Sequence, residues 1–244
     1  ESAIGDARID FDTLKLQTSA DHWIIHKLQV AIKDTAEHLE ALRFSEAFDN
    51  LYHFVWDDVA DWYIEASKSD QNPTVLAYVL DSILRLLHPF APFVTETIWQ
   101  TLDVTGTENL IVQLWPNAKK YKSDAQKVED FEAIKTIVTE ARFITSSLGV
   151  QKCALYYTDA PFLKDNAPLI ARLAKLSKVA EVQSGRGMHL TQTTHNCWLD
   201  IDSHTAAEYV TKLKKDKVDK EVSIARLEQR LGNKDYVKKA PKDV

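Results

Sequence analysis

The stretch LLHPFAPFVTETIWQTL, from Leu86 to Leu102, decides the architecture of the first part of this 244-residue chain. Two prolines stand here between apolar runs that repeat at helical spacing. Pro89 disfavours helical geometry at His88, whereas Pro92 suits the first turn of a new helix, where the N–H that proline lacks has no intrahelical partner. The stretch therefore predicts a tight corner between two helices, with His88 as a hydrogen-bonding residue of that corner.

Helical periodicity also dominates the sequence before this corner. One predicted helix is capped by Ser19 and runs to about Arg43, and another begins at Pro73. Between them, apolar residues recur at steps of three and four, which predicts one continuous buried face. That face consists of Phe48, Leu51, Tyr52, Val55, Val59, Trp62, Tyr63 and Ala66. These elements predict a helical bundle over residues 1–116.

The pattern changes after the bundle. TGTENLIVQLWP, from Thr105 to Pro116, predicts a loop and a short β-like run. Another helix should end at Gly149, and short strands around a helix then predict a small α+β module, which together fill residues 117–203. One long charged helix ending near Gly232 should occupy residues 204–244. The predicted fold class is therefore mainly α, with a bundle, a small α+β module and a long C-terminal helix.

Charge is unevenly distributed along the chain. The net charge is −6, but residues 204–244 carry 11 Lys and Arg against 7 Asp and Glu, a net of +4 that leaves −10 for residues 1–203. A solvated charged helix is the simplest explanation of the basic tail from charge alone. No apolar run of about 18 residues and no signal-peptide pattern is present, so neither a membrane span nor secretion is expected. Because the chain begins with Glu1, it is expected to be a fragment.

The sequence contains no recognisable catalytic or metal-binding motif. His22 and His26 have a spacing that can chelate a metal on a helix, but no third ligand is nearby. Cys153 and Cys197 are far apart, which argues against zinc and against a disulfide scaffold and favours a reducing cytoplasm. The carboxylates of the second helix are interpreted as a solvated polar face. They are Asp57, Asp58, Asp61 and Glu65.

Several stretches, in their order and spacing, resemble the anticodon-binding helical domain of class I aminoacyl-tRNA synthetases for branched aliphatic amino acids. They are DHWIIHKL (21–28), LYHFVWDDVADWYIEASK (51–68), LLHPFAPFVTETIWQTL (86–102) and VQLWP (112–116). The ending RLGNKDYVKKAPKDV (230–244) resembles the pattern L-x-N-x-x-[FY]-V-x-K-A-P-x-x-V of valyl-tRNA synthetases. In that family the pattern lies between the two helices of a C-terminal coiled coil.

The resemblance implies the C-terminal fragment of a valine–tRNA ligase, in which the bundle reads the tRNA anticodon and the coiled coil reaches the outer corner of the tRNA. No catalytic residues, metal or cofactor are expected in this chain. ATP and Mg²⁺ would act in the absent catalytic half, and the parent enzyme would be cytoplasmic and monomeric. Two alternatives stay open: a fragment of an isoleucyl- or leucyl-tRNA synthetase, and a helical interaction scaffold that binds no RNA.

The resemblance also implies roles for individual residues. Ile64 corresponds to a residue near the anticodon, although plain bundle packing is an equally good interpretation, and Arg226 corresponds to the arginine that contacts the tRNA corner. Arg230 follows on the same predicted helix. Further candidates are chosen for charge alone: Lys212, Lys214, Lys215, Lys234 and Lys238. The second coiled-coil helix has no counterpart here, so the long helix is expected to pack on the body, pair with another molecule or be mobile.

Overall fold

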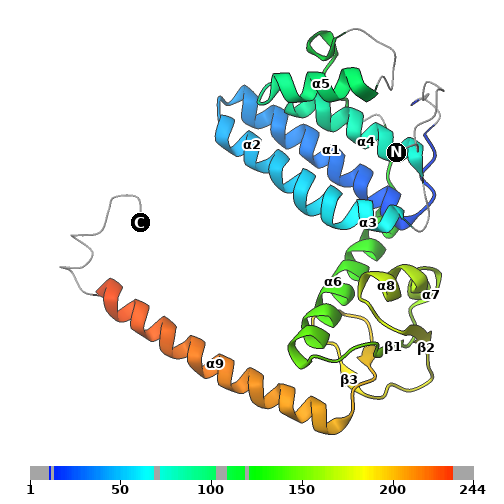
Figure 1. Cartoon of the computed structure of the whole chain (residues 1–244), viewed down its shortest axis with the longest axis vertical. Helices are drawn as coiled ribbons and strands as arrows, with labels where there is room; N and C mark the ends of the chain where they lie inside the picture. The colour runs from blue at the N-terminus through cyan, green and yellow to red at the C-terminus, as the bar shows by residue number, and fades with distance from the viewer. Residues whose placement is uncertain (1–10, 12–13, 69–71, 103–108, 119–120, 233–244) are drawn as a thin grey trace. The chain divides into compact units, whose positions relative to one another are not determined.

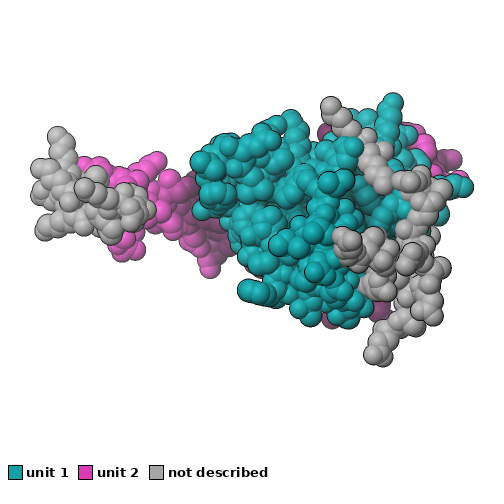
Figure 2. All heavy atoms as spheres, turned by 90° about the horizontal axis from the view of Figure 1, so that it is seen from above, with its two compact units in different colours: residues 1–138 teal, residues 139–244 magenta. Residues whose placement is uncertain are grey.

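A computed structural model describes residues 11, 14–68, 72–102, 109–118 and 121–232 (Figure 1). As predicted, the fold is mainly α with a small sheet and a long last helix. The chain forms two compact units, residues 1–138 and 139–244 (Figure 2). The predicted three-part division at residues 116 and 203 stays a prediction about domains.

The first unit is built from helices that pack side by side. Its elements are α1 (Ser19–Glu40), α2 (Phe44–His53), η2 (Phe54–Tyr63), α3 (Ile64–Ser67), α4 (Pro73–Leu87), α5 (Pro92–Leu102), the short 3₁₀ turn η3 (Leu110–Val112) and the first part of α6 (Ala125–Leu148). α1 packs against α2, η2 and α4, and α4 packs against α5. α2, η2 and α3 follow one another without a break, and η2 is π-helical.

The predicted helix corner is confirmed. α4 ends at Leu87 and α5 begins at Pro92. The N–H groups of Phe90 and Ala91 donate to the Leu87 carbonyl at 3.0 and 2.9 Å, and His88 Nδ1 lies 2.9 Å from Thr95 Oγ1. The corner is therefore closed by hydrogen bonds from its own backbone and from His88.

Two local predictions are wrong. The cap of α1 is Thr18 rather than Ser19: its hydroxyl accepts from Asp21 N–H at 3.1 Å while Asp21 accepts from Thr18 N–H at 3.2 Å, a capping box. In addition, the β-like run is a 3₁₀ turn at Leu110–Val112, whose Leu110 N–H donates to Glu96 at 3.0 Å. A side chain of α5 accepts from this N–H, so no strand partner is needed there.

The predicted buried face of the second helix is partly wrong. Phe48 and Tyr52 are exposed and Trp62 is only partly buried. The buried residues are Ala47, Leu51, Phe54, Val59, Tyr63 and Ala66. In η2 the hydrogen bond spans five residues, as in Ile64 N–H to the Val59 carbonyl. This wider turn changes the phase of the helix, so strict steps of three and four do not follow one face.

Phe48→Ala is expected to lower the free energy of unfolding by about 1 kcal/mol or less, because the ring is 44% exposed and leaves no sealed cavity when it is removed. Urea unfolding of the variant measures this loss. Phe54→Ala is the matched control, since it removes a buried ring from the same helical run and should cost clearly more. Equal losses for the two variants would contradict the burial assigned to them.

A buried carboxylate joins three helical elements of the first unit. Asp21 is 2% exposed and accepts from the Tyr63 hydroxyl at 2.8 Å and from Asn72 Nδ2 at 2.9 Å. The backbone N–H groups of Gln17 and Thr18 complete its shell at 3.0 and 3.2 Å. Burial and the neighbouring Asp21 raise the pKa of the Tyr63 hydroxyl, which keeps it a donor. This network fixes the start of α1 to the end of η2 and to the residue that precedes α4.

The second unit is a small α+β fold, as predicted. Its elements, after the end of α6, are β1 (Ala154–Tyr157), α7 (Pro161–Asp165), α8 (Ala167–Leu173), β2 (Lys178–Glu181), β3 (Met188–His189), β4 (Cys197–Leu199) and α9 (Ser203–Gly232). The strand order is β2-β1-β4-β3, with β1 parallel to β2 and antiparallel to β4. All four residues of β1 are buried, so this central strand forms the core of the unit.

α6 contributes the buried carboxylate of Glu140 to this unit and ends at Gly149, as predicted. Glu140 is 4% exposed and accepts from the N–H groups of Thr191 and Gln192 at 2.7 and 2.9 Å, which holds the segment after β3. Gly149 ends α6 at a φ of 65°, a conformation that glycine adopts without strain.

Candidate functional site

Four aromatic side chains form an exposed line along α2 and the start of η2. Phe44, Phe48, Tyr52 and Trp56 follow one another at intervals of four residues, and each is between 44% and 59% exposed. Residues four apart lie on the same face of a helix. We call these four residues the aromatic row. A contiguous set of exposed aromatic rings marks a surface that binds something, because single exposed rings are ordinary but lines of them are not.

The rings of the aromatic row have defined orientations. Tyr52 and Trp56 are parallel, with ring centroids 6.3 Å apart and an angle of 4° between the ring planes. Phe48 contacts Phe90 with centroids 5.6 Å apart. The row therefore presents ordered ring surfaces, and a planar ligand could stack on them at little further entropic cost.

Ile64 continues the same spacing at the end of η2. It lies eight residues after Trp56 and is 40% exposed. In an α-helix, positions four apart drift around the axis because a turn contains about 3.6 residues. The wider π-helical turn reverses this drift, and so η2 returns Ile64 toward the side of the helix that carries the aromatic row.

The helices that carry the aromatic row are acidic. Their exposed carboxylates are Glu46, Asp49, Asp57 and Asp61. Asp57 Oδ2 lies 2.8 Å from His53 Nδ1. Several like charges at one surface repel phosphate groups. The aromatic row is therefore suited to uncharged planar rings rather than to phosphates.

α9 has the opposite charge. Its last buried side chain is Tyr209, and all residues from Val210 to Gly232 are exposed. Seven cations face four carboxylates in this span. The cations are Lys212, Lys214, Lys215, Lys217, Lys220, Arg226 and Arg230. Beyond Tyr209 the described part of α9 does not pack on the body of its unit, and only Lys212 contacts it. Of the three behaviours expected for this helix, pairing with another molecule and mobility therefore stay as predictions.

Asp58 is not solvated, contrary to the prediction. Its carboxylate lies 3.9 Å from Lys27 Nζ and 3.6 Å from Lys135 Nζ, and burial raises its pKa in spite of both lysines. Burial also opposes ionisation of Glu132, but a hydrogen bond from Trp23 Nε1 at 2.7 Å and the same lysines lower the pKa of that carboxyl. These groups form an ion-pair cluster that holds α6 against α1 and η2.

The histidines and cysteines have structural environments. His22 Nδ1 accepts from Asp124 N–H at 3.0 Å, and burial lowers the pKa of its imidazole. Burial also raises the thiol pKa of Cys153, and that of Cys197 to about 12, so both thiols stay protonated at neutral pH. In the described ranges, His, Cys, Asp and Glu nowhere form a group of three able to hold a metal ion. The described helices also include none that is both long and apolar enough to cross a membrane.

Residues 21–154 match the family described as the anticodon-binding domain of tRNA ligase. The chain belongs to this family. The matched residues include the whole helical run that carries the aromatic row and continue through α6 to the first residue of β1. The anticodon-binding domain therefore accounts for most of the first unit.

Valine–tRNA ligases resemble this chain over almost its full length. The enzyme of Nocardia farcinica is 34% identical over 245 residues, that of Thermotoga maritima 32% over 243, and that of Bacillus subtilis 31% over 262. These alignments cover 93%, 93% and 96% of this chain. The chain spans less than a third of each relative, namely 27%, 28% and 29% of their lengths.

The predicted site residues lie in both units. Ile64 belongs to the anticodon-binding domain, at the junction of η2 and α3. Lys212, Lys214, Lys215, Arg226 and Arg230 all lie on α9 and are exposed. Lys212 Nζ donates to the Ser147 carbonyl at 3.2 Å, so its amine also contacts the end of α6. Lys234 and Lys238 lie outside the described residues.

Sequence reasoning missed the aromatic row. It placed Phe48 and Tyr52 in the core and did not single out Phe44 or Trp56. The sequence did contain an indication of it, because aromatic residues recur every four positions from Phe44 to Trp56 and none of these positions belongs to the buried set. Two apolar lines on one helix can be separated when only one of them contains the small residues that close packing needs, such as Ala47.

Proposed function

We propose that this chain is the tRNA-binding C-terminal part of a valine–tRNA ligase, which binds valine tRNA at its anticodon and at its outer corner. Membership of the anticodon-binding family and the similarity of 93% of the chain to valine–tRNA ligases support the proposal. The attachment of valine, with ATP and Mg²⁺, is assigned to the part of the parent enzyme outside this chain. The parent enzyme is proposed to be a cytoplasmic monomer.

The aromatic row is the observation that carries the proposed anticodon contact. Anticodon bases are unpaired, so they can leave their own stack and lie on protein aromatic rings. Tyr52 and Trp56 already present parallel ring faces, and the acidic surroundings disfavour a phosphate at the same place. Ile64 then offers an apolar contact to a neighbouring base.

α9 is the proposed contact for the tRNA corner. Its exposed lysines and arginines can reach phosphates without a rearrangement of the protein, and each phosphate contact releases counterions from the RNA. Arg226 can in addition stack its planar guanidinium on an exposed base while it donates to a phosphate. A lysine can donate to a phosphate, but its ammonium group cannot stack on a base at the same time.

Binding of tRNA to the 244-residue chain tests the proposal. Fluorescence titration with valine tRNA, with the same tRNA carrying a foreign anticodon, and with a non-cognate tRNA should give the tightest binding to the first. Affinity should also fall steeply with salt, since phosphate contacts release counterions. Equal weak binding of all three RNAs would contradict the proposal and favour a helical module that binds protein.

Arg226→Ala is expected to weaken binding of valine tRNA by about 1–2 kcal/mol, because it removes a stacking and a phosphate contact together. Lys215→Ala, on the same exposed helix, is the matched control and should lose only a phosphate contact. Titration of both variants at two salt concentrations measures the difference. The specific role of Arg226 is wrong if the two variants show the same small loss and the same salt dependence.

A further inference from the structure

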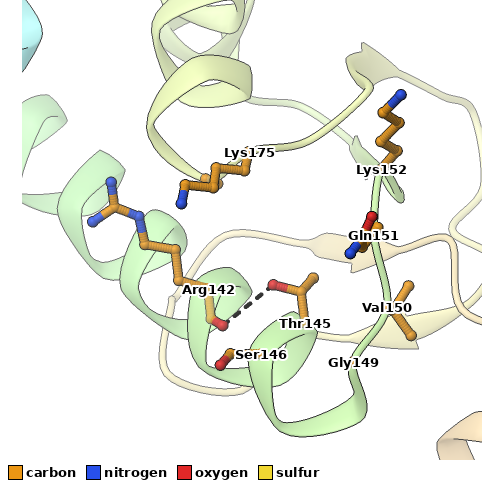
Figure 3. Close-up of a pocket in the computed structure, with 9 residues that line it drawn as sticks. Arg142, Thr145, Ser146, Gly149, Val150, Gln151, Lys152 and Lys175 are labelled. Atoms are coloured by element: carbon orange, nitrogen blue, oxygen red, sulfur yellow. Dashed lines mark hydrogen bonds between the residues drawn. The ribbon is translucent and has the colours of Figure 1, made fainter.

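A hollow of about 790 Å³ lies in the second unit, where α6 and α8 both end. Its wall is formed by the last turns of α6, by residues 149–152 and by the two residues that follow α8 (Figure 3). We call it the basic hollow, because three of its lining residues are Arg142, Lys152 and Lys175. Neither the proposed anticodon contact nor the contact by α9 uses these three residues.

The charges around the basic hollow are of one sign. Among the described residues that line it, none is acidic. Arg142 Nε donates to the Leu173 carbonyl at 2.6 Å, which fixes the guanidinium at the end of α8. In Figure 3 the Lys175 amine extends toward the Arg142 guanidinium, above Thr145 and Ser146. The Lys152 amine extends away from these two groups, on the opposite side of the hollow. The like charges of Arg142 and Lys175 repel each other, and a bound anion relieves that repulsion.

Two of these cations stand in strained backbone positions. Lys175 has a φ of 54° and Lys152 a φ of 57°, in the left-handed region that favours glycine. Lys175 closes α8: its own N–H donates to Arg172 and that of Leu176 to Ala171, the arrangement in which glycine is the usual residue. A lysine is less favourable than glycine in this backbone conformation, and its presence therefore suggests that the side chain has a function.

α9 brings a fourth cation to the rim of the hollow. Lys212 Nζ donates to the Ser147 carbonyl at 3.2 Å, one residue beyond Ser146 of the lining. The exposed lysines 214 and 215 follow directly on the same helix. The start of α9 therefore adds positive charge beside the basic hollow through Lys212.

We infer that the basic hollow binds a backbone phosphate of tRNA. The inference rests on the proposed function and extends it to the module between the anticodon-binding domain and α9. A phosphate fits this arrangement, because Lys175 can act as a point charge beside the Arg142 guanidinium, while Lys152 adds positive charge on the opposite side of the hollow. It also supplies a phosphate contact that the acidic surface around the aromatic row does not offer.

A structural role is the competing explanation. Cations near the ends of helices interact favourably with the helix dipole, and both α6 and α8 end here. The two explanations differ for glycine substitutions. Glycine removes the charge but adopts the left-handed conformation more easily than lysine, so the backbone should keep or gain stability.

The test uses the 244-residue chain with Lys152→Gly and Lys175→Gly combined. Binding of valine tRNA at about 0.1 M salt should weaken about tenfold, and the slope of log K against log salt should fall by about 1, because one phosphate contact is lost. The melting temperature should stay equal or rise. Lys164→Ala is the control, since it removes an exposed cation of α7 that does not line the hollow.

Each outcome decides the inference. A loss of affinity and slope in the double variant, with little change in the control, supports it. Unchanged binding by the double variant overturns it while the proposed function stands, whereas absence of tRNA binding by the unchanged chain defeats both. A fall in melting temperature that parallels the loss of binding overturns it in favour of the helix-end role. A last outcome is that about 10 mM inorganic phosphate raises the melting temperature of the unchanged chain but not of the double variant, while both bind tRNA equally. The hollow would then bind free phosphate rather than tRNA, and the inference would again be overturned.

Discussion

Asp21→Ala is expected to lower the free energy of unfolding by about 3–5 kcal/mol. The substitution removes the side chain that completes the capping box of α1, a loss of about 1 kcal/mol. It also leaves the buried Tyr63 hydroxyl without its acceptor and the Asn72 amide with the Lys15 carbonyl as its one remaining acceptor, at about 1–3 kcal/mol for each N–H or O–H that becomes unsatisfied. A neighbouring water that enters the space would recover part of this loss.

Urea unfolding followed by circular dichroism measures the effect. Asp49→Ala is the control, because it removes an exposed carboxylate from α2 and should change the stability by no more than about 0.5 kcal/mol. Tyr63→Phe should recover part of the loss when it is combined with Asp21→Ala, since it removes one of the stranded donors. A loss below about 1 kcal/mol for Asp21→Ala would show that the carboxylate does not hold the three elements together.

The combined variant Tyr52→Ala with Trp56→Ala is expected to weaken binding of valine tRNA by about 2–5 kcal/mol. Each base that stacks on an aromatic side chain contributes about 1–3 kcal/mol, and the two rings present adjacent parallel faces. Stability should change little, because both rings are at least half exposed. The salt dependence of binding should also change little, since neither side chain carries charge.

The comparison that separates stacking from general surface damage uses two further variants. Trp56→Phe keeps an aromatic face and should retain most of the affinity. Phe93→Ala removes a ring on α5 that is 88% exposed but lies outside the aromatic row, and it should leave affinity unchanged. Titrations in which Phe93→Ala weakens binding as much as the combined variant would contradict the assignment of the aromatic row.

Local stereochemistry made parts of this fold predictable. Pro89 and Pro92 restrict their own and neighbouring dihedral angles, so the corner around His88 follows from adjacent residues alone. Gly149 similarly marks the end of α6 through its own conformation. The long charged α9 was also predictable, because no other element has to supply its hydrogen bonds.

Features that depend on distant residues could not be predicted. Asp58 reads as one of several exposed carboxylates until the fold brings Lys27 and Lys135 beside it. The burial of Tyr63 was predicted, but its hydrogen bond to Asp21, 42 residues away, was not, and the π-helical turn leaves Trp62 only partly buried against the prediction. Lys152 and Lys175 have no pattern that indicates a left-handed conformation, since glycine is the residue that usually signals one.

For the candidate site the division is similar. The resemblance pointed to Ile64 and Arg226, and charge alone pointed to the lysines of α9, whereas the aromatic row and the basic hollow emerged from exposure and geometry. Phe44 and Trp56 could have been found by spacing, but the basic hollow combines the ends of two helices and a loop, so no stretch of sequence carries it.

The separation of charge along the chain has a kinetic consequence for the proposed function. Residues 1–203 carry a net −10 and residues 204–244 a net +4, so a polyanion is attracted at long range only by the end of the chain. Encounter with tRNA should therefore begin at α9, and substitutions there should mainly slow association, increasingly so at low ionic strength. The uncharged aromatic row acts only after encounter, and its loss should shorten the lifetime of the complex.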